Sequence, residues 1–197
     1  MRDSAAIRRA GGFVSATALL VFVAACGGGD GDTGQRQPAA GASASVDAAG
    51  HNDADVQFAQ GMIPHHQQAV EMAELAATRA ANAQVKELAA KIAEAQAPEI
   101  SVMTGWLATW GAPAPSPSPE AGHQMGDAGM AGLEKASGAE FDRMFLDMMI
   151  RHHEGALEMA AAEQRQGQQP EAKALAKKIE TDQTAEIQRM KTLLGTL

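Results

Sequence analysis

Cysteine and aromatic residues are scarce in this sequence. Its 197 residues include one cysteine, five phenylalanines, two tryptophans and no tyrosine. A single cysteine cannot form an internal disulfide, and the lack of further thiolates argues against a structural zinc site. A β-sandwich needs many β-branched and aromatic residues, whereas an alanine-rich chain favours closely packed helices. The composition therefore predicts an all-α protein with one domain plus tails.

The sequence also lacks a cluster of basic residues. Sixteen Lys and Arg stand against 24 Asp and Glu, which gives a formal net charge of −8. Residues 1–25 contribute three arginines and one aspartate, so the chain without them has a net charge of −10. Binding to nucleic acid depends on clustered Lys and Arg at the phosphates. We therefore expect no nucleic-acid partner.

Residues 1–25 have the pattern of an export signal. Three arginines precede an apolar run at residues 13–25, which is too short to span a bilayer permanently. The run ends in Val23-Ala24-Ala25-Cys26-Gly27, which resembles a bacterial lipobox. This resemblance implies cleavage before Cys26 and a lipid on its sulfur. The alternative is an accidental or buried cysteine. We expect an extracytoplasmic protein, lipid-anchored to the bacterial cell membrane or periplasmic.

The rest of the chain divides into a tether and a helical domain. Residues 26–50 contain small and polar residues with almost no large apolar side chains, which predicts a flexible tether. The domain is expected at residues 51–197. Its parts are a helical hairpin at 51–110, a Pro/Gly/Ser-rich linker at 111–137 and a second hairpin at 138–197. Two hairpins with a long connection imply a four-helix bundle.

Several residues mark the expected helix ends. Asn52 to Asp55 are N-cap candidates for the first helix. Pro98 should kink the second helix. Ser137 with Glu140 forms a capping-box pattern at the start of the third helix. Gly167 suits the end of that helix, and Pro170 suits the first turn of the fourth.

The two hairpins are copies of one sequence. The segment Met62–Ala73, Met-Ile-Pro-His-His-Gln-Gln-Ala-Val-Glu-Met-Ala, recurs 87 residues later as Met149–Ala160, Met-Ile-Arg-His-His-Glu-Gly-Ala-Leu-Glu-Met-Ala. The repeat continues without a gap, and such self-similarity dictates architecture. Nine further residues recur at the same offset: Lys86, Leu88, Lys91, Ile92, Gln96, Glu99, Ile100, Met103 and Leu107 return as Lys173, Leu175, Lys178, Ile179, Gln183, Glu186, Ile187, Met190 and Leu194.

Helical periodicity places the repeated histidines and methionines on the inward face. Glu99 and Glu186 lie on the apolar stripes of their helices, and a buried carboxylate needs a partner. Counting outward from each hairpin turn sets His65 level with Glu99 and His152 level with Glu186. The same count sets Met62 beside Met103 and Met149 beside Met190, whereas Glu71 and Glu158 face solvent. We predict a polar layer of four His and two Glu with these four Met stacked beside it. The candidate metal ligands are Met62, His65, His66, Met72, Glu99, Met149, His152, His153, Met159 and Glu186.

Each of these residues also has a purely structural interpretation. Methionine at helical spacing often fills a core, and a buried histidine can simply bond to a neighbouring carboxylate. If the layer binds a metal, imidazole combined with thioether favours copper, as Cu(I) or Cu(II). The linker repeats this chemistry at His123, Met125 and Met130, which could deliver a metal or be incidental.

The repeated motif resembles that of domain-of-unknown-function family 305. The family signature is similar to Met-Ile-x-His-His-x-x-Ala-x-x-Met-Ala, and both copies match it at Met62–Ala73 and Met149–Ala160. The resemblance covers about residues 51–197. It implies an exported protein with a ferritin-like helical bundle, and copper binding with a role in copper tolerance through the His and Met positions. The family has no settled activity.

Two other functions are compatible with the sequence. Ferritin-like di-iron proteins carry Glu-x-x-His on two helices, but Met62 and Met149 stand three residues before His65 and His152. Iron is therefore the second metal we consider. A module that binds an envelope protein without metal is the third function. We favour an anchored copper protein for storage, tolerance or delivery, with no catalytic residues identified and its protein partner unknown.

Overall fold

The structure, a computed structural model, describes residues 50–115 and 126–197. The predictions for residues 1–49, including Cys26 and the tether, and those for His123 and Met125 lie outside this part of the chain. None of the described helices is both long and apolar enough to cross a membrane.

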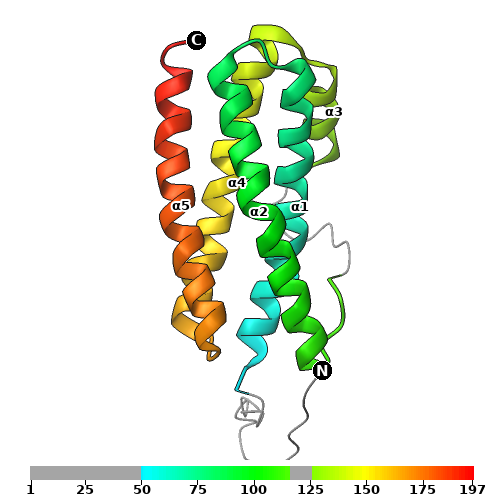
Figure 1. The fold of residues 1–197 in the computed structure, drawn as a ribbon, viewed down its shortest axis with the longest axis vertical. Coiled ribbons are helices and arrows are strands. Elements are labelled where there is room, and N and C mark those ends of the chain that lie inside the picture. Colours follow the sequence, from blue (N-terminus) through cyan, green and yellow to red (C-terminus); the bar gives the residue numbers. More distant parts are fainter. Residues whose placement is uncertain (1–49, 116–125) are drawn as a thin grey trace, which may run out of the picture. The chain divides into compact units, whose positions relative to one another are not determined.

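Four long helices and one short helix form the described domain (Figure 1). Helices α1 and α2 make one antiparallel hairpin, α4 and α5 make the other, and α1 packs against α4. The predicted all-α four-helix bundle is confirmed. The helices are α1 (Asp53–Arg79), α2 (Ala83–Trp110), α3 (Asp127–Lys135), α4 (Gly138–Gln166) and α5 (Pro170–Leu194).

Helix α3 is the main departure from the expected architecture, because it lies inside the segment predicted to be a linker. Its glycines give it a weak intrinsic helix preference. Leu133, however, is fully buried, and Met130 packs against the same apolar cluster. Tertiary packing against α1 and α4 therefore stabilises a helix that the local sequence does not favour.

The helix ends follow the expected residues, with one correction at Ser137. Asn52 caps α1: its side chain accepts the Ala54 and Asp55 amides at 2.9 and 3.2 Å, and Asp55 accepts the Asn52 amide at 2.7 Å. Ser137 is the N-cap of α4, but its side chain makes no capping bond. Helix α2 passes through Pro98 as one continuous α-helix.

Each hairpin has one buried aspartate that binds the turn of the other hairpin. Asp55 on α1 accepts the backbone amides of Gln168 and Gln169 in the α4–α5 turn, at 2.9 to 3.1 Å. Asp142, its counterpart 87 residues later, accepts the amides of Ala81 and Asn82 in the α1–α2 turn at 3.1 and 2.9 Å. The duplication thus produces two equivalent crossed connections.

The apolar core is divided into two clusters, named here the upper and lower cores after their places in Figure 1. The upper core draws on the end of α1 and the start of α4; the lower core draws on the start of α1 and the end of α4. The upper core includes Met72, Ile92, Phe141, Phe145, Met149 and Met190, and the lower core includes Phe58, Met62, Met103, Leu107, Ala160 and Ile179. Along each helix, the repeated histidines fall between these two sets of residues.

Candidate metal centre

Four buried histidines occupy the middle of the bundle, two from α1 and two from α4. Each of His65, His66, His152 and His153 is at most 1% exposed. The rings of His65 and His152 meet at the centre, with centroids 3.6 Å apart and planes tilted by 35°. Burial holds the pKa of His152 well below its ordinary value, and the three neighbouring histidines lower it further. The central ring of His152 is therefore neutral.

The two outer histidines bind the two inward glutamates. His66 Nε2 lies 2.9 Å from Glu99 Oε2, and His153 Nε2 lies 2.7 Å from Glu186 Oε2. The sequence predicted His65 and His152 as the partners, and this assignment was wrong by one residue. The count from the turn fixes only height, whereas neighbouring residues differ by about 100° around the helix axis. His66 faces α2 and His65 faces α4, so the glutamate reaches His66.

The carboxylates determine which ring nitrogen carries the proton. A carboxylate oxygen only accepts, so the Nε2–H groups of His66 and His153 donate to Glu99 and Glu186. In a neutral imidazole this leaves a bare lone pair on Nδ1. Both Nδ1 atoms are buried without a hydrogen-bond partner among the described residues. Histidines that bind metals are commonly held this way, with the second nitrogen bonded to a carboxylate.

Charges around Glu99 keep this unit in one protonation state. Burial lowers the pKa of His66, although the hydrogen bond and charge of Glu99 act in the opposite direction. Burial would raise the pKa of Glu99, but hydrogen bonds from His66 and Lys178 outweigh it and the pKa falls below its ordinary value. At neutral pH, Glu99 is a carboxylate and His66 a neutral donor.

The methionines lie on both sides of the histidines and not in one stack. Met62 and Met103 belong to the lower core, and Met149 and Met190 to the upper core, all fully buried. The two methionines of each predicted pair belong to the same apolar cluster. The prediction that all four methionines stack together was wrong because α1 and α4 run in opposite directions. A residue one turn before the histidines therefore lies below the layer on α1 and above it on α4 (Figure 1).

The last methionine of each motif lies farther from the layer. Met72 is six residues after His66, about 9 Å along the helix axis. It is fully buried in the upper core, whereas its counterpart Met159 is half-buried beside Gly61. The two positions are therefore not equivalent in packing. Glu71 and Glu158 are exposed, as expected.

The donors suit a metal, but they are not assembled into a chelate. Among residues 50–115 and 126–197, no three His, Cys, Asp or Glu side chains are placed to hold a metal ion. The buried Nδ1 lone pairs of His66 and His153 nevertheless fit copper, as do the thioethers one turn away. The rings of His65 and His152, whose centroids are 3.6 Å apart, would have to separate before either could turn a nitrogen toward a shared ion.

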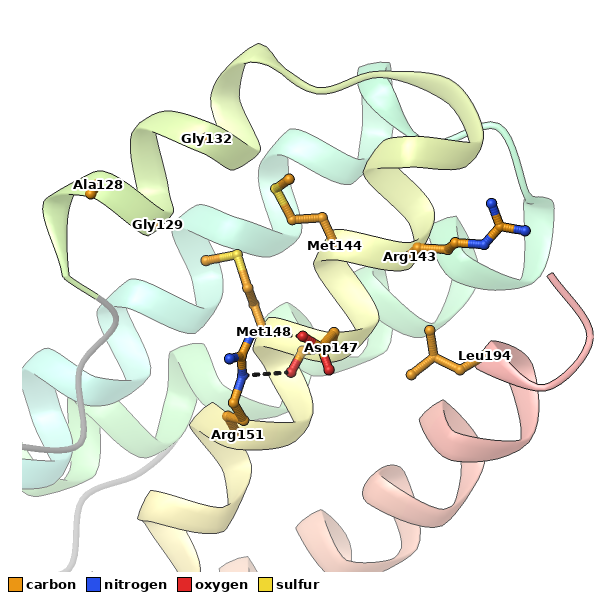
Figure 2. Close-up of a pocket in the computed structure, with 9 residues that line it drawn as sticks. All are labelled: Ala128, Gly129, Gly132, Arg143, Met144, Asp147, Met148, Arg151 and Leu194. Carbon is orange, nitrogen blue, oxygen red and sulfur yellow. Dashed lines mark hydrogen bonds and ion pairs between the residues drawn. The ribbon is translucent and has the colours of Figure 1, made fainter.

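Other sequence candidates lie away from the layer. His51 is 6% exposed and stacks on Trp110, with ring centroids 4.7 Å apart. Met130 is half-buried on α3. An open groove of about 700 Å³ between α3, α4 and α5 contains Met144 and Met148, and none of its described lining residues is a histidine (Figure 2). Its lining residues are Ala128, Gly129, Gly132, Arg143, Met144, Asp147, Met148, Arg151 and Leu194.

Sequence reasoning overlooked three charged residues that shape this domain. Lys178 lies 2.9 Å from Glu99, and its recurrence as Lys91 was a signal that it matters. Asp142 could have been found as the counterpart of Asp55. Glu163 gave no such signal, because Ala76 occupies its place in the first hairpin. Burial, followed by the nearby Asp55, raises the pKa of Glu163 to about 8.

Known proteins share both the sequence pattern and the fold. The model of the family described as domain of unknown function DUF305 matches residues 55–194. A crystal structure of a candidate secreted DUF305 protein from Streptomyces coelicolor is 33% identical, with a TM-score of 0.69 over 73% of this chain and 93% of that one. A DUF305 fragment from Deinococcus radiodurans is 35% identical, with a TM-score of 0.69 over 74% and 97%.

A third similar structure contains copper. CopM in its Cu(II)-bound form is 33% identical, with a TM-score of 0.64 over 72% of this chain and 96% of that one. CopM has also been solved in Cu(I)-bound and Ag-bound forms. A comparison with curated protein sequences found no match. The family match and these structures show that the chain belongs to the DUF305 family.

Proposed function

We propose that this protein binds copper in the histidine layer and serves copper storage, tolerance or delivery outside the cytoplasm. The observation that carries the proposal is the pair of buried histidines, His66 and His153, whose Nε2 atoms are held by Glu99 and Glu186 and whose Nδ1 atoms are unpartnered among the described residues. CopM, a structurally similar protein that is 33% identical, was solved with Cu(I), Cu(II) and Ag bound, which supports the same chemistry here.

The glutamates, histidines and methionines of the site have different roles in copper binding. Glu99 and Glu186 fix the orientation of the outer rings, so their lone pairs need little reorganisation. His65 and His152 supply the central imidazoles, and Met62 and Met149 supply thioethers, which suit Cu(I). The upper and lower cores exclude water from the layer. Copper, when bound, would bring redox chemistry, and these residues would control its exposure.

Copper is favoured over iron by the available donors. Di-iron carboxylate sites use four glutamates with two histidines. This layer has two glutamates, and one of them is already paired with Lys178. A metal-free adaptor would need an exposed apolar surface. In the described part of the chain, Val102 is the single exposed large hydrophobic residue, at 46%.

Anchoring by a lipid on Cys26 is a further part of the proposal, and it rests on the lipobox pattern alone. The mature protein is expected to begin at Cys26 and to partition into detergent. Cys26→Ala should release the protein or leave it unprocessed. Recovery of a wild-type protein that keeps residues 1–25 and stays in the aqueous phase would contradict the anchor.

Metal analysis of the full chain tests the copper assignment. Protein purified from its native compartment should contain copper in excess of iron, and in competition it should bind Cu(I) and Cu(II) more tightly than Fe(II). Glu71→Gln with Glu158→Gln, two exposed positions of the motif, provides a folded control that should bind like the wild type. Retention of iron in preference to copper would overturn the assignment.

A further inference from the structure

The two copies of the His–Glu unit differ in one ion pair. Lys178 on α5 crosses to α2, where its Nζ lies 2.9 Å from Glu99 Oε1. The equivalent crossing in the other direction would join Lys91 on α2 to Glu186 on α5. Lys91 instead lies 2.6 Å from Glu87, on its own helix. Among the described residues, one glutamate of the layer is therefore bound by a lysine and its counterpart is not.

The acidic neighbours of the lysines explain this difference. Lys178 has Asp182 one turn after it, at 2.8 Å, on the side toward Glu99. Lys91 has alanine in that place and has Glu87 one turn before it, which draws its ammonium the other way. Arg189, 3.7 Å from Glu87, helps to hold that carboxylate. The asymmetry is thus encoded in the sequence at positions four residues from each lysine.

The lysine changes what Glu99 can offer. Both oxygens of Glu99 are engaged, Oε2 by His66 and Oε1 by Lys178, and its side chain is 10% exposed. In the described part of the chain, Glu186 forms its ion pair with His153 alone and is 21% exposed. The ammonium of Lys178 beside the nearly buried carboxylate of Glu99 repels a second cation, although water screens part of the repulsion because Lys178 is 55% exposed.

We propose that Lys178 makes the two His–Glu units unequal, so that copper occupies the His153–Glu186 unit before the His66–Glu99 unit. This inference rests on the proposed copper function. Lys178 is a positioning residue, because it acts through Glu99 and does not itself bind the metal. The second unit fills when the lysine leaves Glu99, and Asp182 is placed to keep the released ammonium nearby.

Single-unit variants of the full chain separate the two copies. His66→Ala leaves the His153–Glu186 unit, and His153→Ala leaves the His66–Glu99 unit. Each variant is combined with Lys178→Gln or with the matched control Lys91→Gln. Both lysines are exposed (55% and 56%), so the substitutions should not disturb folding. The probe is Cu(II), added in competition with a chelator of known affinity.

We expect Lys178→Gln to change the Cu(II) affinity in the His153→Ala background only. His66→Ala should bind Cu(II) more tightly than His153→Ala, by roughly 3- to 10-fold, as for a charge partly screened by water. Lys178→Gln should remove that gap by raising affinity in the His153→Ala background, and Lys91→Gln should change neither. In the metal-free protein, Lys178→Gln should also shift the ring nitrogen resonances of His66 more than those of His153.

Two outcomes would overturn the proposal. Equal Cu(II) affinity of the two single-unit variants, or an equal effect of Lys178→Gln in both, would refute the role of the lysine while leaving copper binding intact. Absence of Cu(II) binding by the folded wild type would refute the copper function, and the inference with it.

Discussion

The two hairpins of this bundle share their polar centre but differ around it. Each provides two histidines and one glutamate to the layer, and each provides a buried aspartate to the turn of the other. The features that recur are those that define the fold and the donor set. A feature kept at the same position in both copies is therefore a better guide to function here than any single residue.

The hairpins differ in the residues that surround these shared side chains. Lys178 reaches Glu99, but Lys91 does not reach Glu186. Glu163 lies beside Asp55, whereas alanine occupies the equivalent place beside Asp142. These residues change the charge and the packing around the shared elements. Duplication sets the site, and divergence makes its two halves unequal.

The largest effect is expected where the hairpins are joined. Asp142→Ala removes a carboxylate that accepts two backbone amides from the α1–α2 turn, and should lower the free energy of unfolding by about 3 kcal/mol. Asp55→Ala removes the equivalent carboxylate, which accepts the amides of Gln168 and Gln169, and should be similarly destabilising. Urea unfolding measures both.

The exposed Asp147, paired with Arg151 on the helix surface, is the control for these aspartates. Asp147→Ala should cost less than about 1 kcal/mol. If Asp142→Ala were no more damaging than this surface change, the crossed connections would not stabilise the bundle.

The next effect is a loss of copper affinity on changing Glu99 and Glu186, which occupy equivalent positions in the two hairpins. Replacing Glu99 and Glu186 together by Gln keeps their shape but removes the charge that holds the outer imidazoles. Copper affinity should fall by roughly 10- to 100-fold, the usual loss for groups that orient a ligand. The apo-protein should stay folded, because a neutral amide is cheaper to bury than a carboxylate. Isothermal titration with a competing chelator provides the measurement.

The matched change at Glu71 and Glu158 tests whether the inward position matters. Those two carboxylates are exposed in both copies. A loss of affinity in Glu71→Gln with Glu158→Gln equal to that in the inward pair would show that overall charge, and not the layer, controls binding.

A further predicted effect distinguishes the hairpins by the pH dependence of their stability. The folded-state pKa of Glu163 is about 8, above its ordinary value of 4.5, so the folded protein holds this proton more tightly than the unfolded chain does. That stabilisation is complete below pH 4.5 and is lost as the pH rises toward 8. Relative to Glu163→Gln, the wild type should therefore lose stability steadily as the pH rises across this window.

Thermal or urea unfolding between pH 4 and 9 gives the two curves. Glu71→Gln should run parallel to the wild type, because Glu71 is exposed. Parallel curves for Glu163→Gln and the wild type would show that Glu163 titrates normally and is not a buried acid.

The sequence predicted the bundle, the turns and the inward glutamates, because each depends on periodicity within one hairpin. It could not predict which histidine meets Glu99, since that depends on how α1 is rotated against α2. It also placed all four core methionines together, because the antiparallel packing of α1 on α4 is a tertiary property. Helix α3 was missed for a similar reason: Leu133 stabilises it through burial in the upper core.

The copper affinity of the full chain after removal of both outer histidines shows most directly whether the layer is the copper site. His66→Ala with His153→Ala deletes the two carboxylate-held imidazoles, and the loss should exceed the roughly 10- to 100-fold expected for the glutamates that orient them. His51→Ala, a buried histidine stacked on Trp110 away from the layer, should leave copper affinity nearly unchanged once folding has been verified. Equal losses in the two variants, or copper binding that survives removal of both outer histidines, would contradict the assignment of the layer as the copper site.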